Sequence, residues 1–263
     1  MTTSPTAGPD LSAKAVSDTA DRRDQGTIYH GRALLTFAAE GEVIHDGAVH
    51  VIGERITDIG TLRDVQRRHP EAALHGDTDT VVIPGLVDGH QHGRALSPSA
   101  QGVQDQALEL WLVDQRNIRK VDPELSTQIA AIRMLLGGIT SALHADVVRD
   151  PRRFGHDTLA ALEGYRKAGL RVQFGIDVKD RASFTYDDDH EVRAWLPESI
   201  AHKLPAAASP SLDALDDILR TAQQRTTNSP IQVGLAPRGP QWCTDGALEW
   251  VAAYAHTGTP VQT

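Results

Sequence analysis

The sequence predicts an α/β protein in which helices cover a parallel β-sheet. After residue 85, short apolar runs rich in β-branched residues alternate with segments of helical periodicity. Such apolar runs are typical of parallel strands that are buried on both faces. An open doubly wound sheet and a (β/α) barrel both fit this alternation. No glycine-rich phosphate-binding fingerprint follows any of the runs, which weakens the dinucleotide-binding form of the open sheet.

The residues before 85 have a different composition and a different pattern of apolar residues. Residues 1–25 are polar, contain Pro and Gly, and lack the apolar core of a secretion signal, so they predict a disordered tail. Residues 26–84 contain short β-type runs, and Gly53 and Glu54 separate two of them as a hairpin turn does. The sequence therefore predicts a small β-rich domain at 26–84 and a larger domain at 85–263.

The larger domain is predicted to alternate strands with helices. The strands fall near residues 80–88, 139–145, 170–176, 231–236 and 259–263, and the helices fall in 105–115, 122–138, 156–169, 211–226 and 244–258. The second helix has clear boundaries, because Asp122 is a typical cap, Pro123 suits the first position, and Gly137 follows the last turn. The acidic run at 185–195 is predicted to be a solvated loop, with a lid as the alternative. In a barrel these strands are parallel neighbours in chain order.

Composition and charge exclude several classes of function. The formal net charge of -9 and the pI near 5.7 argue against nucleic acid or an acidic membrane as partner, because a phosphate backbone requires clustered positive charge. Cys243 is the single cysteine, which excludes an internal disulfide and suits a reducing compartment. No apolar run reaches the ~18 residues of a membrane span, and we therefore expect a cytoplasmic protein.

Two histidines, His90 and His92, lie one residue apart directly after a short apolar run. Side chains at this spacing on a strand point to the same side, so these two can converge on one atom. Neutral imidazoles at that spacing make half of a divalent metal site, since zinc takes three or more protein ligands. The alternative is a pair of solvated loop histidines. The buried strand and Asp88 before the pair favour the metal site.

Other polar residues near the predicted strand ends are candidates for substrate binding. Arg238 follows the strand at 231–236, and its guanidinium can donate two bonds in one plane to a heterocycle oxygen or a carboxylate, with a surface salt bridge as the alternative. Arg94 and Gln91 flank the histidine pair and could orient ligands or substrate, although a structural role is favoured for Gln91.

Five further residues have both a functional and a structural interpretation. His144 and Asp146 end the strand at 139–145, where they either line a pocket or form a hydrogen-bonded structural pair, and the structural pair is favoured. Trp242 and Trp111 could form an aromatic wall for a flat ring, but the helical pattern around Trp111 favours core packing. Cys243 has no base near it in sequence and is predicted to be a small buried filler.

Several segments resemble one known family. "VVIPGLVDGHQHG" at 81–93 is similar to the first barrel strand of the amidohydrolase superfamily of metal-dependent hydrolases. The segments at 108–112, 133–143, 165–175 and 235–263 resemble the deaminase and chlorohydrolase branch of that superfamily, in the same order. Residues 26–84 look like the amino-terminal part of the small β-sandwich that accompanies such barrels. The resemblance covers nearly everything after the tail.

The resemblance implies a TIM-type (β/α)8 barrel, of which this chain carries the first half, about five strands, preceded by part of a β-sandwich. It implies one divalent metal, zinc or iron, that activates water, with His90 and His92 as two ligands. The remaining ligands and a Glu acid/base are expected beyond Thr263, so no catalytic residue is assigned here. The substrate-binding candidates are Arg238, Arg94, Trp242 and His144.

The implied function is hydrolysis of a carbon–nitrogen bond in a small cyclic or nitrogen-rich molecule, by a deaminase or amidohydrolase. Two alternatives stay open, a triazine-type chlorohydrolase and a non-catalytic half-barrel that binds a partner. The expected partners are a small-molecule substrate and the carboxy-terminal half of the barrel, in the same parent protein or in a second chain, and a homo-oligomer is a further option. We expect the 263-residue chain alone to be inactive.

Overall fold

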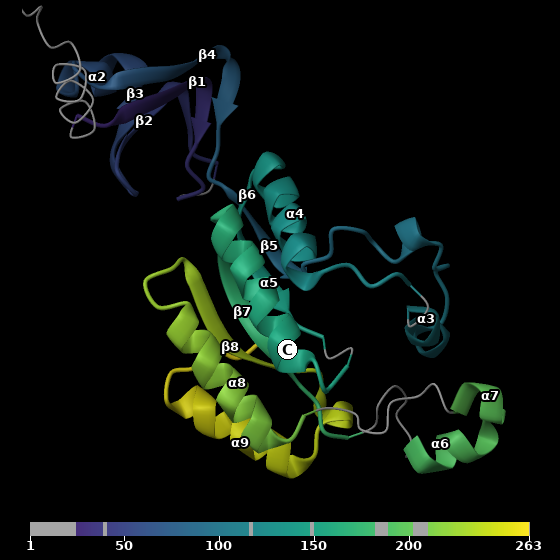
Figure 1. Ribbon diagram of the computed structural model, residues 1–263. Coiled ribbons are helices and arrows are strands. Elements are labelled where there is room, and N and C mark those ends of the chain that lie inside the picture. The colour runs from purple at the N-terminus through teal and green to yellow at the C-terminus, as the bar shows by residue number, and fades with distance from the viewer. Residues whose placement is uncertain are drawn as a thin grey trace, which may run out of the picture. The chain divides into compact units, whose positions relative to one another are not determined.

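The chain divides into two compact units, Met1–Pro84 and Gly85–Thr263 (Figure 1). The computed structural model describes residues 25–38, 41–115, 118–147, 150–181, 189–201 and 210–262. The tail predicted at 1–25 lies outside the described residues except for Gln25. None of the helices in these ranges is both long and apolar enough to cross a membrane.

The described residues of the first unit form a four-stranded sheet with the strand order β3-β2-β1-β4 and one helix. Its elements are β1 (Thr27–Leu35), β2 (Val43–Ile52), β3 (Arg55–Thr61), α2 (Leu62–Arg68) and β4 (Ala73–Val82). The hairpin predicted at Gly53 and Glu54 is confirmed, because Ile52 pairs with Arg55 across the turn between antiparallel β2 and β3. The sequence interpretation missed α2, whose start is fixed by Thr61: its hydroxyl accepts a hydrogen bond from the Asp64 amide.

The second unit contains a four-stranded parallel sheet in the order β5-β6-β7-β8. Its strands are β5 (Leu86–Gln91), β6 (Ile139–Ala145), β7 (Arg171–Val178) and β8 (Ile231–Pro237). Val261 continues the order through a parallel bridge to Leu235. Parallel pairing in chain order is therefore confirmed for this sheet.

The first predicted strand, 80–88, is wrong as a single element. Residues up to Val82 belong to β4 and pair with β1 in the first unit, whereas β5 begins at Leu86 in the second. The break falls at Pro84, because proline has no amide hydrogen to donate to a ladder and its ring fixes φ. A continuous apolar run therefore conceals a boundary between two sheets.

The predicted helices of the second unit are present. They are α3 (Leu108–Asp114), α4 (Pro123–Leu136), α5 (Phe154–Ala168), α8 (Leu212–Arg225) and α9 (Asp245–His256), with short α6 (Asp189–Trp195) and α7 (Glu198–Ala201) between β7 and α8. Asp122 caps α4 as predicted, since its carboxylate accepts from the Leu125 amide at 2.9 Å. The prediction of a solvated loop at 185–195 is wrong for 189–195, which form α6, and the rest of that run lies outside the described residues.

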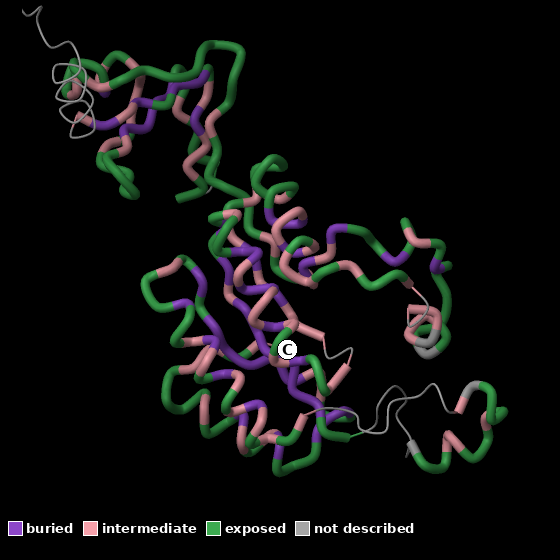
Figure 2. Tube along the Cα trace, viewed as in Figure 1, coloured by how far each residue is buried: buried purple, intermediate pink, exposed green. Residues whose placement is uncertain are grey.

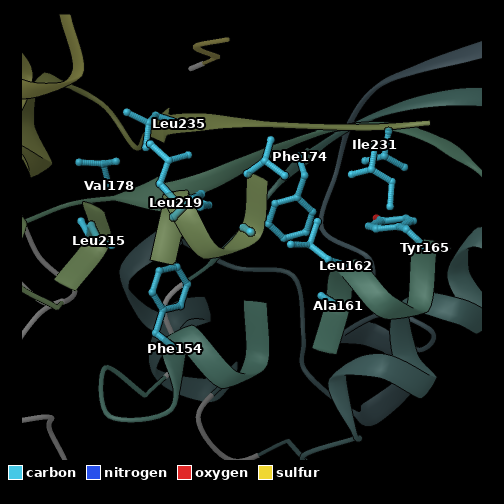
Figure 3. Packing of buried hydrophobic residues seen from close by; sticks show 14 of the residues in the cluster. Phe154, Ala161, Leu162, Tyr165, Phe174, Val178, Leu215, Leu219, Ile231 and Leu235 are labelled. Carbon is cyan, nitrogen blue, oxygen red and sulfur yellow. The ribbon is translucent and has the colours of Figure 1, made fainter. Parts of the chain in front are cut away.

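The core of the second unit lies between the sheet and its helices, mainly α5 and α8 (Figure 3), and the same buried cluster includes Ala131 of α4 and Ala247 and Val251 of α9. Buried residues concentrate along β7 and β8 and on the helix sides that face them (Figure 2). Tyr165 from α5, Leu219 from α8 and Phe174 from β7 have no exposed surface. β5, in contrast, leaves Leu86 and Val87 exposed. The helices therefore bury the centre of the sheet, and the residues at its strand ends are attached to this packed core.

Candidate metal centre

Side-chain alternation divides the strand ends between two faces of the parallel sheet. Ala142 on β6 and Phe174 and Ile176 on β7 lie in the core formed with α5 and α8. His144 lies two residues after Ala142, so it has the same parity, which means that its side chain points to the same face of the sheet. Gln91 is in register with His144, and the side chains of His144 and Gln91 therefore both point towards these helices. Side chains of the opposite parity point to the other side of the sheet, which we call the site face. They include His90 at the end of β5, His92 just after β5, Asp177 on β7 and Arg238 just after β8.

The rings of His90 and His92 have the separation that two ligands of one metal ion require. Their centroids are 4.9 Å apart and their planes are inclined by 84°. Two imidazoles bound to one ion at about 2.0–2.1 Å with a near-tetrahedral angle place their centroids about 5 Å apart. The pair therefore fits two positions of a mononuclear site.

The hydrogen bonding of His92 leaves one ring nitrogen for a ligand. Its Nδ1 lies 2.7 Å from the carbonyl oxygen of Ala145, so Nδ1 carries the proton and donates, and Nε2 keeps its lone pair. Burial lowers the pKa of His92 to about 4; the charge of Arg94 adds to this, and the bond to Ala145 opposes it. The ring is therefore neutral at pH 7, which is the state that binds a metal.

The described residues supply only part of a metal site. Within them, no third His, Cys, Asp or Glu gathers with the histidine pair into a group that could hold an ion. A bound ion in this chain would therefore have two protein ligands of these types among the described residues, fewer than a stable zinc site uses.

Beneath the pair, Gln91 joins a buried hydrogen-bond network on the helix side of the sheet. Its Oε1 accepts from the Gly93 amide, and its Nε2 donates to the hydroxyl of Tyr165. The Tyr165 hydroxyl lies 2.7 Å from His144 Nδ1, and His144 stacks on Phe174 with centroids 4.2 Å apart. The sequence offered no signal for Tyr165, which lies on α5, 74 residues from Gln91.

His144 is buried on the helix side of the sheet, and it does not form the hydrogen bond to Asp146 that the sequence favoured. Its side chain is 2% exposed and points to the helices, away from the site face. Within the described residues His144 Nε2 has no hydrogen-bond partner, and Asp146 Oδ1 lies 3.9 Å away. Asp146 in turn accepts from the Thr158 hydroxyl at 2.7 Å. These contacts support the end of β6.

Arg238 and Asp177 form an ion pair at the carboxyl ends of β8 and β7. Nε of Arg238 lies 3.2 Å from Asp177 Oδ1, and Nη2 of Arg238 contacts Asp177 Oδ2, so the ion pair is bidentate. Asp177 is 2% exposed and Arg238 is 23% exposed. The guanidinium is thus fixed by a buried carboxylate and keeps an accessible edge. The sequence interpretation missed Asp177, although a lone acid inside the apolar run of β7 was a visible signal.

The aromatic candidates and the cysteine are less accessible. Trp242 is 5% exposed, and Lys179 Nζ, from a residue that is itself 2% exposed, lies 5.0 Å from its ring centroid. Trp111 is half-buried on α3. Cys243 is 2% exposed and its thiol donates to the Val178 carbonyl at 3.3 Å, while burial raises its thiol pKa. Its predicted role as a buried filler agrees with these contacts.

A parallel α/β sheet with a His-X-His pair at the end of its first strand defines a candidate metal-dependent enzyme. The family model described as the Amidohydrolase family matches residues 81–263, and the chain belongs to this family. It is 28% identical over 178 residues to the 5-methylthioadenosine/S-adenosylhomocysteine deaminase of Thermodesulfovibrio yellowstonii, a match that covers 64% of this chain and 38% of the relative.

Two solved structures have a similar fold. An adenosine deaminase from Xanthomonas campestris with bound zinc has a TM-score of 0.63 at 19% identity, over 90% of this chain and 48% of that one. A guanine deaminase from C. acetobutylicum with bound guanine has a TM-score of 0.63 at 16% identity, over 90% of this chain and 52% of that one. The chain thus spans about half the length of these structures and less of the curated relative.

Proposed function

We propose that this chain forms the metal-binding part of a hydrolase that cleaves a carbon–nitrogen bond in a small cyclic or nitrogen-rich molecule. The observation that carries the proposal is the pair of rings of His90 and His92, 4.9 Å apart at the end of the first parallel strand. Membership of the Amidohydrolase family supports it, and so do the three relatives, each named as a deaminase. The proposed reaction class is deamination or amide hydrolysis.

One divalent ion, zinc or iron, is the proposed cofactor, and when bound it supplies a Lewis acid that activates water. His90 and His92 hold it through neutral ring nitrogens, and the bond from His92 to Ala145 sets which nitrogen is free. No group in this chain is assigned as the general acid or base.

Arg238 is the proposed substrate-binding residue. Because Asp177 fixes its guanidinium, the accessible edge can donate in-plane hydrogen bonds to a substrate oxygen at little cost in side-chain entropy. Arg94 lies beside the histidine pair and is the second candidate. The burial of Trp242 and His144 favours a supporting position for both rather than direct contact with substrate.

The remaining ligands and the Glu acid/base are proposed to come from residues that complete the barrel. The matched region is 38% of the length of the curated relative, which leaves room for them in a longer polypeptide or in a second chain. We propose that the chain alone is inactive, because general acid–base catalysis typically contributes about 100- to 10,000-fold.

Metal analysis tests the histidine pair. We expect His90→Ala and His92→Ala each to lower the zinc or iron content of the assembled protein, whereas His156→Ala, at an exposed position on α5, should leave it unchanged. Unchanged metal content in both site variants would end the proposal.

A substrate panel tests the reaction. The chain is assayed with purines, pyrimidines, triazines and cyclic amides, alone and with a carboxy-terminal half supplied. Ammonia release that needs both parts and His92 supports a deaminase, whereas chloride release from a triazine supports the chlorohydrolase alternative. Robust turnover by the chain alone would show that the proposed division of the site is wrong.

A further inference from the structure

We propose that Gln91 is a positioning residue for the metal centre: through a buried chain of hydrogen bonds to Tyr165 and His144, it fixes the turn that presents His92. The inference rests on the proposed metal-binding function of the histidine pair. Gln91 lies between the two histidines in sequence, but its side chain points to the opposite face of the sheet. Gln91 therefore supports the site from the helix side of the sheet and does not itself contact metal or substrate.

The network determines the orientation of the Gln91 amide group. The Gly93 backbone amide can only donate, so the Gln91 atom that faces it is the oxygen, Oε1. The amide nitrogen, Nε2, is then the atom that donates to the Tyr165 hydroxyl. One planar group thus links the turn at 91–93 to helix α5, and rotation about its last bond would break both contacts.

The chain continues with one direction of donation. Because Tyr165 receives a hydrogen bond from Gln91, its own proton is available for His144 Nδ1, 2.7 Å away. Burial raises the pKa of Tyr165, so the hydroxyl keeps this proton. Tyr165 has no exposed surface and lies on the same side of the sheet as Phe174, on which His144 stacks (Figure 3). Buried and aligned in this way, each bond reinforces the next.

The turn itself is tightly enclosed. Gly93 has φ +61°, and a Cβ placed there would lie 3.0 Å from Cε1 of His144. His92 lies between Gln91 and Gly93 and donates through Nδ1 to Ala145, the neighbour of His144 on β6. The same two residues of β6 therefore fix the turn on the helix side and the ligand ring on the site face. A turn released from Gln91 would let the ring of His92 leave Ala145 and lose its fixed tautomer.

The experiment removes the amide without removing the side chain's volume. Gln91→Leu deletes both hydrogen bonds, Tyr165→Phe deletes the hydroxyl and keeps the ring, and Gln232→Leu places the same substitution at an exposed position of β8 as the control. Three quantities are measured on the chain assembled with a carboxy-terminal half: zinc affinity by calorimetry, the Nδ1–H signal of His92 by long-range ¹H–¹⁵N NMR, and the Tm. Zinc bound by a His90→Ala/His92→Ala double variant is subtracted, because the chain has other histidines.

We expect Gln91→Leu to weaken zinc binding about tenfold, the lower end of the effect of outer-shell partners, and to weaken or abolish the Nδ1–H signal of His92. Tyr165→Phe should change both quantities in the same direction by less, and Gln232→Leu should change neither. If Gln91→Leu or Tyr165→Phe lowers the Tm yet leaves zinc affinity and the His92 signal as in the parent, the network is merely structural and the inference is wrong.

The two proposals fail in different ways. If the assembled parent protein binds no more zinc than the assembled double variant, while Gln91→Leu still removes the Nδ1–H signal of His92, the metal proposal fails and the positioning of His92 stands. If zinc binding depends on His92 but Gln91→Leu changes neither the zinc affinity nor the Nδ1–H signal of His92, the metal proposal stands and the positioning role is refuted.

Discussion

Replacement of Gly93 by alanine is expected to destabilise the second unit more than the same change at another glycine with positive φ. Gly93 has φ +61° and Gly138 has φ +83°, so in both cases a Cβ is forced into the left-handed region at a cost of about 1–2 kcal/mol. The surroundings differ. A Cβ at Gly93 would lie 3.0 Å from His144 and 3.2 Å from Thr127 Oγ1, whereas at Gly138 nothing lies within 4 Å.

The difference between the two variants isolates the packing contribution. Both changes reduce the freedom of the unfolded chain equally, which stabilises each variant by about 0.4–1 kcal/mol. Overpacking against the buried His144 costs about 1–3 kcal/mol. We therefore expect Gly93→Ala to lose about 1–3 kcal/mol more free energy of unfolding than Gly138→Ala, because the contacts of His144 with Tyr165 and Phe174 oppose its displacement.

Urea unfolding followed by tryptophan fluorescence measures this difference. All four tryptophans lie after residue 85, so the signal reports the second unit alone. The four are Trp111, Trp195, Trp242 and Trp250. Equal losses in Gly93→Ala and Gly138→Ala would refute the tight packing of the turn against His144, and with it the enclosure on which the positioning of His92 depends.

Three further predictions concern other parts of the chain. Because burial raises the pKa of the Cys243 thiol, we expect its reaction with a disulfide reagent at pH 8 to be much slower in the folded chain than in urea; equal rates would contradict its burial. Asp122→Ala should cost about 1 kcal/mol of unfolding free energy, measured by the fluorescence assay, because the cap on the Leu125 amide is lost; an unchanged urea midpoint would count against that cap. The hydrogen bonds from Arg68 lower the pKa of Asp58, so this carboxylate stabilises the first unit above its unfolded-state pKa, and the contribution disappears as the pH falls through the folded-state value. Asp58→Asn should therefore reduce the acid sensitivity of the NMR signals of that unit, and an unchanged pH profile would show that the pair contributes nothing.

Elements and motifs set by local patterns could be predicted from the sequence. The cap at Asp122, the hairpin at Gly53 and the end of α5 at Gly169 each depend on residues within a few positions of one another. The spacing of His90 and His92 belongs to the same class, since alternation on a strand alone brings the two rings together. The split of 80–88 into two strands was missed because apolar periodicity is the same on both sides of Pro84, and only tertiary pairing shows which sheet each side joins.

The residues that support the site are set by the order of the strands and could not be predicted from local spacing. Gln91 contacts Tyr165 over 74 residues, Arg238 contacts Asp177 over 61, and His92 contacts Ala145 over 53. Residues this far apart in the sequence show no local pattern that links them. Their contacts form only when the strands of the parallel sheet pair in register.

Parity does carry a signal once the strand order is known. In β6 the buried Ala142 identifies the helix side, and His144, two residues on, must share it, whereas Ala145 must face the other way. In β7 the buried Phe174 and Ile176 place Asp177 on the site face by the same rule. A polar residue that ends a parallel strand is therefore a candidate for contact with metal or substrate only when its parity is opposite to that of the buried apolar residues. A residue with the same parity, such as His144, faces the helices instead.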